Sequence, residues 1–233
     1  MRIDFVTLFP EQVLPGLRHS MLARAEGSEL VHFGAVNPRD FALDKHKMVD
    51  DRPCGGGPGM LMKPEPLDAA LLSIHQAGAR VVFPDPCGYR FEDRHARAWA
   101  SDSQIIFVCG HYEGIDQRLV DKWATDRVSL GDFVLTGGEL AAMVMADAVV
   151  RQIPGVLGDS QSLSEDSHSD GLLSYPQYTL PRVWEGREVP EVLLSGDHGA
   201  VARWRRRQAL ETTRQLRPDL YMRAKLTKED FRE

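Results

Sequence analysis

Two segments of the sequence place glycine turns between an apolar run and a helix-like pattern, an arrangement that can bind ligands. Residues 108–116 read VCGHYEGID, and residues 129–139 read SLGDFVLTGGE. In open α/β sheets, ligands collect outside the carboxyl ends of the strands, where such turns lie. Two turns in one sheet could enclose a flat ligand with backbone N–H and C=O groups, as purine recognition requires. Either turn alone is weak support for a site.

A third glycine-rich segment, residues 54–60 (CGGGPGM), lets the backbone approach a ligand or another part of the chain closely. No Lys-Ser or Lys-Thr pair follows its last glycine, so the segment is not a phosphate-binding Walker loop. The spacing also differs from the GxGxxG fingerprint of dinucleotide-binding folds. By itself this segment indicates a tight structural loop.

These segments need a framework of strands and helices to hold them, and the hydrophobic pattern predicts one. Short apolar runs typical of strands occur at residues 3–9, 30–36, 79–83, 105–109 and 127–135. Apolar residues at helical spacing alternate with them at residues 11–24, 66–76, 115–124 and 139–153. This alternation predicts an α/β fold with a mainly parallel sheet.

The chain changes character near residue 158. Residues 158–181 are rich in Ser, Asp and Glu without an apolar period, which predicts a flexible linker. Residues 199–217 then predict an arginine-rich helix that Pro218 ends, and a small helical domain fits this region. Thr227 and Asp230 resemble a capping box at the start of a last short helix.

Length and composition fit a globular protein. The chain has 233 residues, and 42% of them are apolar, enough for a sizeable core. The apolar run near the start is too short for a signal peptide, and no later segment reads as a membrane span, so we expect no membrane partner. The three cysteines, Cys54, Cys87 and Cys109, form neither a CxxC pair nor an even set for disulfides. This usage favours the cytoplasm.

Charge is distributed unevenly along the chain. The net charge is −6, which argues weakly against a nucleic-acid partner. Residues 200–233 nevertheless hold ten Lys or Arg against five Asp or Glu, a net +5, so residues 1–199 carry −11. A basic C-terminal segment on an acidic body suggests a polyanionic partner. Taken alone, such a charge run is more often a solvated helix face.

Five longer motifs occur in the order of one known family. They are residues 49–62 (VDDRPCGGGPGMLM), the GHYEGID segment from Gly110, residues 130–140 (LGDFVLTGGEL), residues 151–157 (RQIPGVL) and residues 178–181 (YTLP). Together they resemble the bacterial branch of the tRNA (guanine-N1)-methyltransferase family, the TrmD family of the SPOUT superfamily, over essentially the whole chain. Several long motifs in the same order are far more specific than any one of them.

The resemblance implies a fold and an activity that the apolar pattern does not give. The fold is an α/β methyltransferase with a deep trefoil knot near its C-terminal strands, plus a small helical C-terminal domain, and the protein works as a homodimer. The activity is transfer of a methyl group from S-adenosylmethionine (S-adenosyl-L-methionine) to N1 of the guanosine at tRNA position 37, beside the anticodon. Local sequence rules argue against a threaded chain, so the knot rests on the resemblance alone.

The resemblance also assigns parts of this chain to the cofactor and to tRNA. Residues 1–157 would bind the cofactor, residues 158–181 would form a flexible linker with the catalytic acid, and residues 182–233 would bind tRNA. The implied cofactor-binding residues are Phe83, Pro86, Gly110, Tyr112, Glu113, Leu130, Gly131, Asp132, Phe133, Val134, Leu135, Gly137 and Gly138. The tRNA-binding candidates are Arg203, Arg205, Arg206 and Arg207, which point several ways around one helix and so favour phosphate contacts.

Asp166 and Arg151 are the catalytic residues that the resemblance implies. Guanine N1 carries a proton and is a poor nucleophile, so a general base must remove this proton as the methyl group is transferred. Negative charge then develops on guanine O6, which a fixed cation would stabilise. Asp166 matches the base and Arg151 the cation. Without the resemblance, Asp166 would be one more linker acid and Arg151 a partner of the helix dipole.

Other chemistry stays open at this point. Family members are associated with Mg²⁺, and Glu113 is the acid that the resemblance places nearest the reaction, while the metal ligands are unknown. A knotted ribose 2′-O methyltransferase would use the same cofactor pocket, and a non-catalytic RNA-binding module would need only the arginines. A metal hydrolase built on the eight histidines is disfavoured, because they are scattered without an HxxxH pair.

Overall fold

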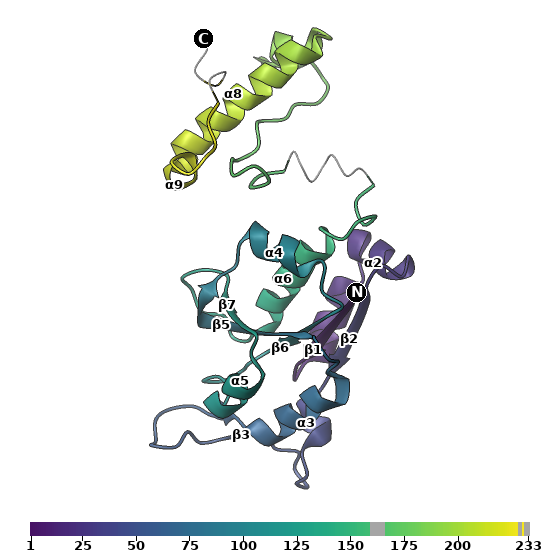
Figure 1. The fold of residues 1–233 in the computed structure, drawn as a ribbon, viewed down its shortest axis with the longest axis vertical. Coiled ribbons are helices and arrows are strands. Elements are labelled where there is room, and N and C mark those ends of the chain that lie inside the picture. Colours follow the sequence, from purple (N-terminus) through teal and green to yellow (C-terminus); the bar gives the residue numbers. More distant parts are fainter. Residues whose placement is uncertain (159–165, 228–229, 231–233) are drawn as a thin grey trace. The chain divides into compact units, whose positions relative to one another are not determined.

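A computed structural model describes residues 1–158, 166–227 and 230 of the chain. The chain forms two compact units, Met1–Gly158 and Asp159–Glu233. The first unit holds a five-stranded sheet with helices around it, and the second is built on one long helix (Figure 1). Residues 159–165, the first part of the predicted linker, lie outside the described residues.

The sheet of the first unit is parallel throughout. Its strands are β1 (Arg2–Val6), β2 (His32–Val36), β5 (Arg80–Arg90), β6 (Gln104–Val108) and β7 (Asp126–Ser129). Their order is β2-β1-β6-β5-β7, and every neighbouring pair is parallel. The predicted α/β class with a mainly parallel sheet is therefore confirmed. All five residues of β6 are buried, as expected for a central strand covered on both faces.

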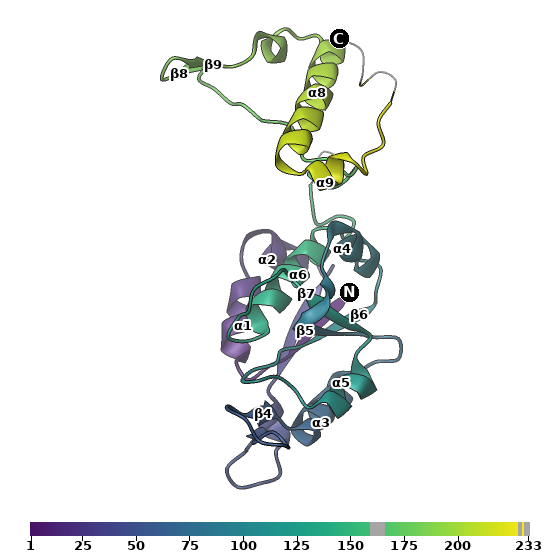
Figure 2. The same cartoon turned by 90° about the vertical axis from the view of Figure 1, so that its left-hand side faces the viewer.

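Helices cover both faces of this sheet (Figure 2). One face carries α1 (Pro10–Leu17), α2 (Ser20–Gly27), α4 (Asp93–Trp99) and α6 (Glu139–Val150), and the other carries α3 (Pro64–Ile74) and α5 (Gln117–Trp123). Side chains alternate along β6 because successive residues of a strand point to opposite faces. Ile105 and Phe107 join the first core, and Ile106 and Val108 join the second.

The prediction of one helix over residues 11–24 is wrong. The structure has α1 and α2 in its place, separated by a break at which Ser20 adopts a φ of 51°, outside the right-handed helical region. Leu17 of α1 and Leu22 of α2 are buried in the same core. Because both helices bury their apolar faces in one core, the apolar pattern continues across the break and conceals it.

Several short elements have no strong apolar period and were not predicted. They are α4 with its capping box at Glu92, the 3-10 helix η1 (Pro38–Phe41), and the short strands β3 (Asp50–Asp51) and β4 (Leu61–Met62), which pair with each other. The strands β3 and β4 flank the glycine-rich loop 54–60. That loop is therefore the connection of a small antiparallel hairpin.

The second unit is organised around α8 (His198–Leu216), which forms the predicted arginine-rich helix. Asp197 caps its first turn by accepting a hydrogen bond from the Ala200 N–H at 2.9 Å. The shorter elements around it are β8 (Val183–Trp184), β9 (Arg187–Glu188), the 3-10 helix η2 (Glu191–Leu194) and α9 (Pro218–Tyr221). The Asp230 carboxylate accepts from the Thr227 N–H at 2.7 Å, as in half of a capping box, and residues 231–233 lie outside the described part.

Candidate functional site

A cavity of about 430 Å³ opens in the first unit beside the bulge in the middle of β5 and the ends of β6 and β7. This volume lies in the range of small-molecule sites, about 300–1,000 Å³. Eleven of the predicted cofactor-binding residues line it, namely Phe83, Pro86, Gly110, Tyr112, Glu113, Leu130, Phe133, Val134, Leu135, Gly137 and Gly138. The structure thus brings residues from three separate parts of the sequence around one space.

Gly131 and Asp132, the other two predicted residues, do not line the cavity. They lie in a turn that ends the predicted strand 127–135 early, since β7 stops at Ser129. The Ser129 hydroxyl accepts from the Gly131 N–H at 3.1 Å and donates to the Gly131 carbonyl at 3.0 Å. A Cβ on Gly131 would lie 3.0 Å from the Phe133 ring, so this glycine lets the ring fold back beside the turn.

The two glycine turns predicted to enclose a ligand lie against each other. His111 and Gly137 form an antiparallel bridge, and the Gly138 N–H donates to the Gly110 carbonyl at 2.9 Å. A Cβ on Gly138 would lie 2.9 Å from the Cys109 Cα, so only glycine permits this approach. Tyr112 adopts a φ of 60°, a left-handed conformation that few non-glycine residues take and that is common at functional sites.

The glycine-rich loop 54–60 lies behind the turn that carries Tyr112 and Glu113. The Glu113 N–H donates to the Met60 carbonyl at 2.9 Å, and the Met62 N–H donates to the Gly114 carbonyl at 2.9 Å. A Cβ on Gly59 would overlap the Glu113 side chain. The loop itself does not line the cavity. The sequence alone indicated a tight structural loop at residues 54–60, and the position of this loop behind the turn agrees with that interpretation.

An ion pair that sequence reasoning missed forms part of the cavity wall. The Arg127 guanidinium donates to Asp85 Oδ2 through Nη2 at 2.6 Å and through Nε at 3.1 Å. The hydrogen bond to Asp85 raises the pKa of Arg127 above its ordinary value. The two residues belong to β5 and β7, which pair side by side. No motif marks them, because they are far apart in the sequence.

A second missed feature is a buried polar chain beside the cavity. The Thr7 hydroxyl donates to Glu139 Oε1 at 2.7 Å, and His111 Nε2 lies 2.7 Å from Glu139 Oε2. Glu139 is only 1% exposed, and it begins α6, where the helix dipole favours negative charge. Burial raises the pKa of the nearby Cys109 thiol, and the Glu139 charge raises it further. In the sequence, the only local indication of Glu139 is the Gly-Gly-Glu run of residues 137–139 at the start of α6.

The two predicted catalytic residues lie elsewhere in the chain. Arg151 caps the C-terminal end of α6, whereas Gly138 caps its start at the cavity. With a rise of 1.5 Å per residue, about 20 Å of helix separate them. Arg151 does not line the cavity of its own chain. Asp166 is half-buried in the second unit, in a turn described below.

The four predicted tRNA-binding arginines differ in their surroundings. Arg203 and Arg207 are exposed on α8. The Arg205 guanidinium lies over the Tyr175 ring, 4.8 Å from its centroid. Arg206 pairs with Asp170 and Asp230 at 2.9 Å each, so its charge is engaged within the unit.

Within residues 1–158, 166–227 and 230, no three His, Cys, Asp or Glu side chains gather around a common point that could hold a metal ion. Glu113, the acid that the resemblance places nearest the reaction, is exposed at the cavity wall.

Comparison with known proteins places this geometry in a family. The profile of the family described as "tRNA (Guanine-1)-methyltransferase TrmD" matches residues 1–223. The chain belongs to this family. The resemblance inferred from the sequence motifs is thereby confirmed.

Curated relatives agree over nearly full length. A tRNA (guanine-N(1)-)-methyltransferase of Staphylococcus carnosus (strain TM300) is 50% identical over 231 residues, which cover 99% of this chain and 94% of the relative. Proteins of the same name from Desulfitobacterium hafniense (strain Y51) and Exiguobacterium sibiricum are 51% and 50% identical, covering 99% and 100% of this chain and 88% and 96% of theirs. Among the described helices of this family member, none is long and apolar enough to span a bilayer.

Proposed function

We propose that this protein transfers a methyl group from S-adenosylmethionine to N1 of the guanosine at tRNA position 37. Membership of the family and the names of its relatives support the reaction. The observation that carries the proposal is the cavity in which two glycine turns meet, beside the bulge of β5 and the ends of β6 and β7. A tRNA substrate also fits a cytoplasmic enzyme.

The cavity suits the cofactor by its chemistry. Phe83 and Phe133 offer apolar rings for an adenine, and the backbone at Gly110 and Leu130 offers polar groups for its edge. S-adenosylmethionine supplies a methyl group on a positively charged sulfur. The Gly138 position, where a side chain would collide with Cys109, keeps the two turns close enough to enclose a ligand.

In the proposed reaction, Asp166 accepts the proton of guanine N1 and Arg151 stabilises the negative charge on O6. An ordinary aspartate has a pKa of about 3.9, well below an ideal base at neutral pH. Closure of the segment around Asp166 would bring its carboxylate to guanine N1 and exclude water from the reaction. Glu113, exposed at the cavity wall, is the acid that would lie nearest a bound Mg²⁺.

We also propose a homodimer in which each site uses two chains. Arg151 lies a helix length from the cavity of its own chain, so a second copy would supply it. Exposed apolar side chains support a covered face, namely Leu135 at the cavity (37% exposed) and Leu140 and Val144 on α6 (53% each). Analytical ultracentrifugation should give a dimer, and a monomer active at assay concentration would contradict this arrangement.

The knot belongs to the same proposal. After β7, the chain returns to the end of β6, where the Gly138 N–H donates a hydrogen bond to the Gly110 carbonyl. This return path supports the trefoil knot of the family near the last strands. In this arrangement residues 1–157 bind the cofactor, residues 158–181 connect the domains and carry the base, and residues 182–233 bind tRNA through exposed arginines such as Arg203 and Arg207.

The test is to identify the product. The protein is incubated with S-adenosylmethionine and unmodified tRNA transcripts, and the digested RNA is analysed by mass spectrometry. We expect N1-methylguanosine at position 37, and a transcript with adenosine there should stay unmethylated. A ribose-methylated product would replace the proposal with the 2′-O methyltransferase, and tRNA binding without any methylation would leave only an RNA-binding module.

A further inference from the structure

Residues 166–175 form a closed turn in the second unit. The Ser169 N–H donates to the Asp166 carbonyl at 3.2 Å, and the His168 N–H donates to the Leu172 carbonyl at 2.7 Å. The hydroxyls of Ser167 and Ser174 lie 2.9 Å apart and close the turn on its other side. Asp166, the proposed base, is the first described residue of this turn, which we call the base turn (residues 166–175).

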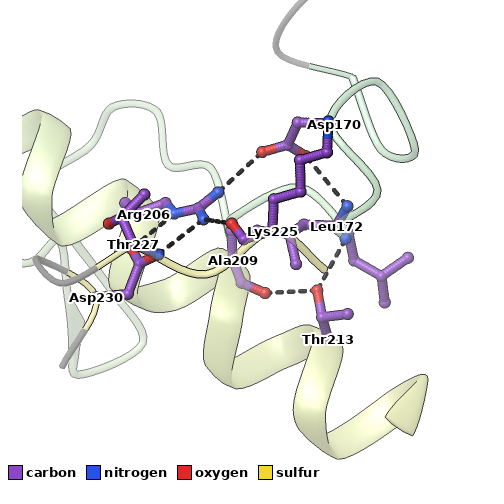
Figure 3. Close-up of polar contacts among 9 residues, drawn as sticks. Asp170, Leu172, Arg206, Ala209, Thr213, Lys225, Thr227 and Asp230 are labelled. Carbon is purple, nitrogen blue, oxygen red and sulfur yellow. Dashed lines mark hydrogen bonds and ion pairs between the residues drawn. The ribbon is translucent and has the colours of Figure 1, made fainter. Parts of the chain in front are cut away.

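The base turn is fastened to α8 by its backbone and by one buried side chain (Figure 3). The Leu173 N–H donates to the Thr213 hydroxyl at 2.8 Å, which in turn donates to the Ala209 carbonyl at 2.6 Å. Leu172 is 2% exposed and packs in the small core with Ala209 and Leu210. The turn is thus part of the packing of α8.

Arg206 of α8 strengthens this attachment with ion pairs to two carboxylates, Asp170 and Asp230 (Figure 3). Its guanidinium donates to Asp170 at 2.9 Å, to both oxygens of Asp230 at 2.9 and 3.0 Å, and to the Lys225 carbonyl at 3.2 Å. Asp170 also accepts from the Leu172 N–H at 3.1 Å, inside the base turn. One side chain of α8 therefore joins the base turn to the C-terminal segment.

The charges around Arg206 are well matched to this role. The Asp230 side chain is 5% exposed, and the hydrogen bonds from Arg206 hold the pKa of that carboxyl well below its usual range. Four of the five guanidinium N–H donors are engaged in these contacts. A phosphate would have to displace Asp170 or Asp230 to reach them.

We propose that Arg206 is a positioning residue, which holds the base turn on α8 so that the tRNA-binding helix places Asp166. This inference rests on the proposed function, and it replaces the prediction that Arg206 binds a phosphate. Docking of tRNA on α8 would then also set the position of the base, because both are fixed to the same helix. Errors of about 1 Å in such placement can cost about a hundredfold in rate.

The test separates positioning from phosphate binding. Single-turnover methyl transfer is measured for Arg206→Gln, Arg206→Lys and Glu211→Gln at saturating S-adenosylmethionine and tRNA, together with the salt dependence of tRNA binding. We expect Arg206→Gln to lower the rate constant by about tenfold to a hundredfold without changing the salt slope. Glu211, exposed on α8, is the control and should leave both unchanged.

Arg206→Lys distinguishes the two roles. A phosphate contact tolerates lysine, which keeps the charge, whereas a fork that joins two carboxylates does not. We therefore expect Arg206→Lys to remain as slow as Arg206→Gln. A wild-type rate for both variants, with a salt slope that flattens by about 0.7 to 0.9 in Arg206→Gln, would overturn the proposal in favour of a phosphate contact.

The Asp170→Asn variant distinguishes a loss of positioning from a simple folding defect. Asp170 is 56% exposed, and its replacement leaves the pairing of Arg206 with Asp230 in place, so α8 should keep its fold. We expect the same slow transfer in Asp170→Asn, and no further loss when it is combined with Arg206→Gln. Independent, additive effects would contradict the link. A wild-type protein that does not methylate guanine N1 would contradict the proposed function rather than the positioning role of Arg206.

Discussion

Glu139 Oε2 lies 2.7 Å from His111 Nε2, although the two residues belong to different glycine turns. The carboxylate is almost fully buried, and the Thr7 hydroxyl satisfies its other oxygen. A buried carboxylate is costly unless it is hydrogen-bonded, so this contact selects one arrangement of the two turns. The cavity wall at Gly110 and Gly137 depends on that arrangement.

Glu139→Gln should therefore destabilise the first unit and weaken cofactor binding together. The amide keeps the size of the side chain but cannot accept from both Thr7 and His111 with the same strength, and we expect a loss of about 1–3 kcal/mol. Thermal unfolding and calorimetric titration with S-adenosylmethionine measure both effects. Glu11→Gln, an exposed acid in the first turn of α1, is the control. Equal behaviour of the two variants would mean that the buried contact has no such role.

Gly138→Ala should be far more damaging than its single methyl group suggests. The new Cβ would lie 2.9 Å from the Cys109 Cα and 3.2 Å from the Gly110 N, which are backbone atoms that cannot rotate away. Overpacking of this kind costs about 1–3 kcal/mol. Gly27→Ala is the control, since nothing lies within 4 Å of its Cβ position. Denaturant unfolding should separate the two variants, and similar midpoints would disprove the close approach of the turns.

Thiol labelling can locate the cofactor. Cys87 is exposed and lines the cavity, Cys54 is exposed outside it, and Cys109 is buried with a raised thiol pKa. We expect two fast reactions with a disulfide reagent in the folded protein and a third only after unfolding. S-adenosylmethionine should slow the labelling of Cys87 and leave Cys54 unaffected, as peptide mass spectrometry would reveal. Protection of neither thiol would place the ligand elsewhere.

The Asp126→Asn substitution should lower the free energy of unfolding at neutral pH. This difference from the wild type should disappear in acid. Burial alone would raise the pKa of Asp126, but hydrogen bonds from Tyr89, Thr125 and Arg80 lower it overall. A lowered folded-state pKa adds stability above the unfolded value of about 3.9, and this stability is lost as the pH falls through the folded value. The difference from the wild type, about 1–3 kcal/mol at pH 7, should shrink below pH of about 4.

The control for that comparison is Asp40→Asn. Asp40 pairs with Lys47 at 3.3 Å, and both side chains are mostly exposed, so the pair contributes less than about 1 kcal/mol. Unfolding curves of both variants across the acid range check the prediction. A gap between Asp126→Asn and the wild type that stays constant down to the lowest pH would contradict a lowered pKa.

Asp166→Asn should abolish turnover while sparing the cofactor. Asparagine keeps the shape and the hydrogen-bonding reach but cannot take the N1 proton, and loss of a positioned base costs about a hundredfold to ten-thousandfold in rate. Single-turnover transfer at saturating ligands separates chemistry from binding. Asp170 is unsuitable as a control because it pairs with Arg206, so Glu211→Gln takes that place. Equal and mild effects in both variants would reduce Asp166 to an ordinary surface acid.

The sequence by itself determined the fold class and most of the cavity wall. Apolar runs that alternate with helical patterns require a parallel sheet covered on both faces. Turns that follow such strands meet at one edge of the sheet, as the two glycine turns do, while the family resemblance carried by the longer motifs is what predicted that Phe83 and Leu135 share a site, and both line one cavity. These features depend on local patterns, which a sequence displays directly.

Only the tertiary structure decided the partners of the charged side chains. Thr7 and Glu139 are 132 residues apart, and Arg206 meets Asp170 across 36, so neither pair has a local signal. The strand order, with β5 between β6 and β7, brings Arg127 to Asp85. Arg206 looked like a phosphate ligand because α8 is rich in arginine, yet folding surrounds it with two carboxylates. Charge in a sequence shows what a residue can bind, and packing determines what it meets.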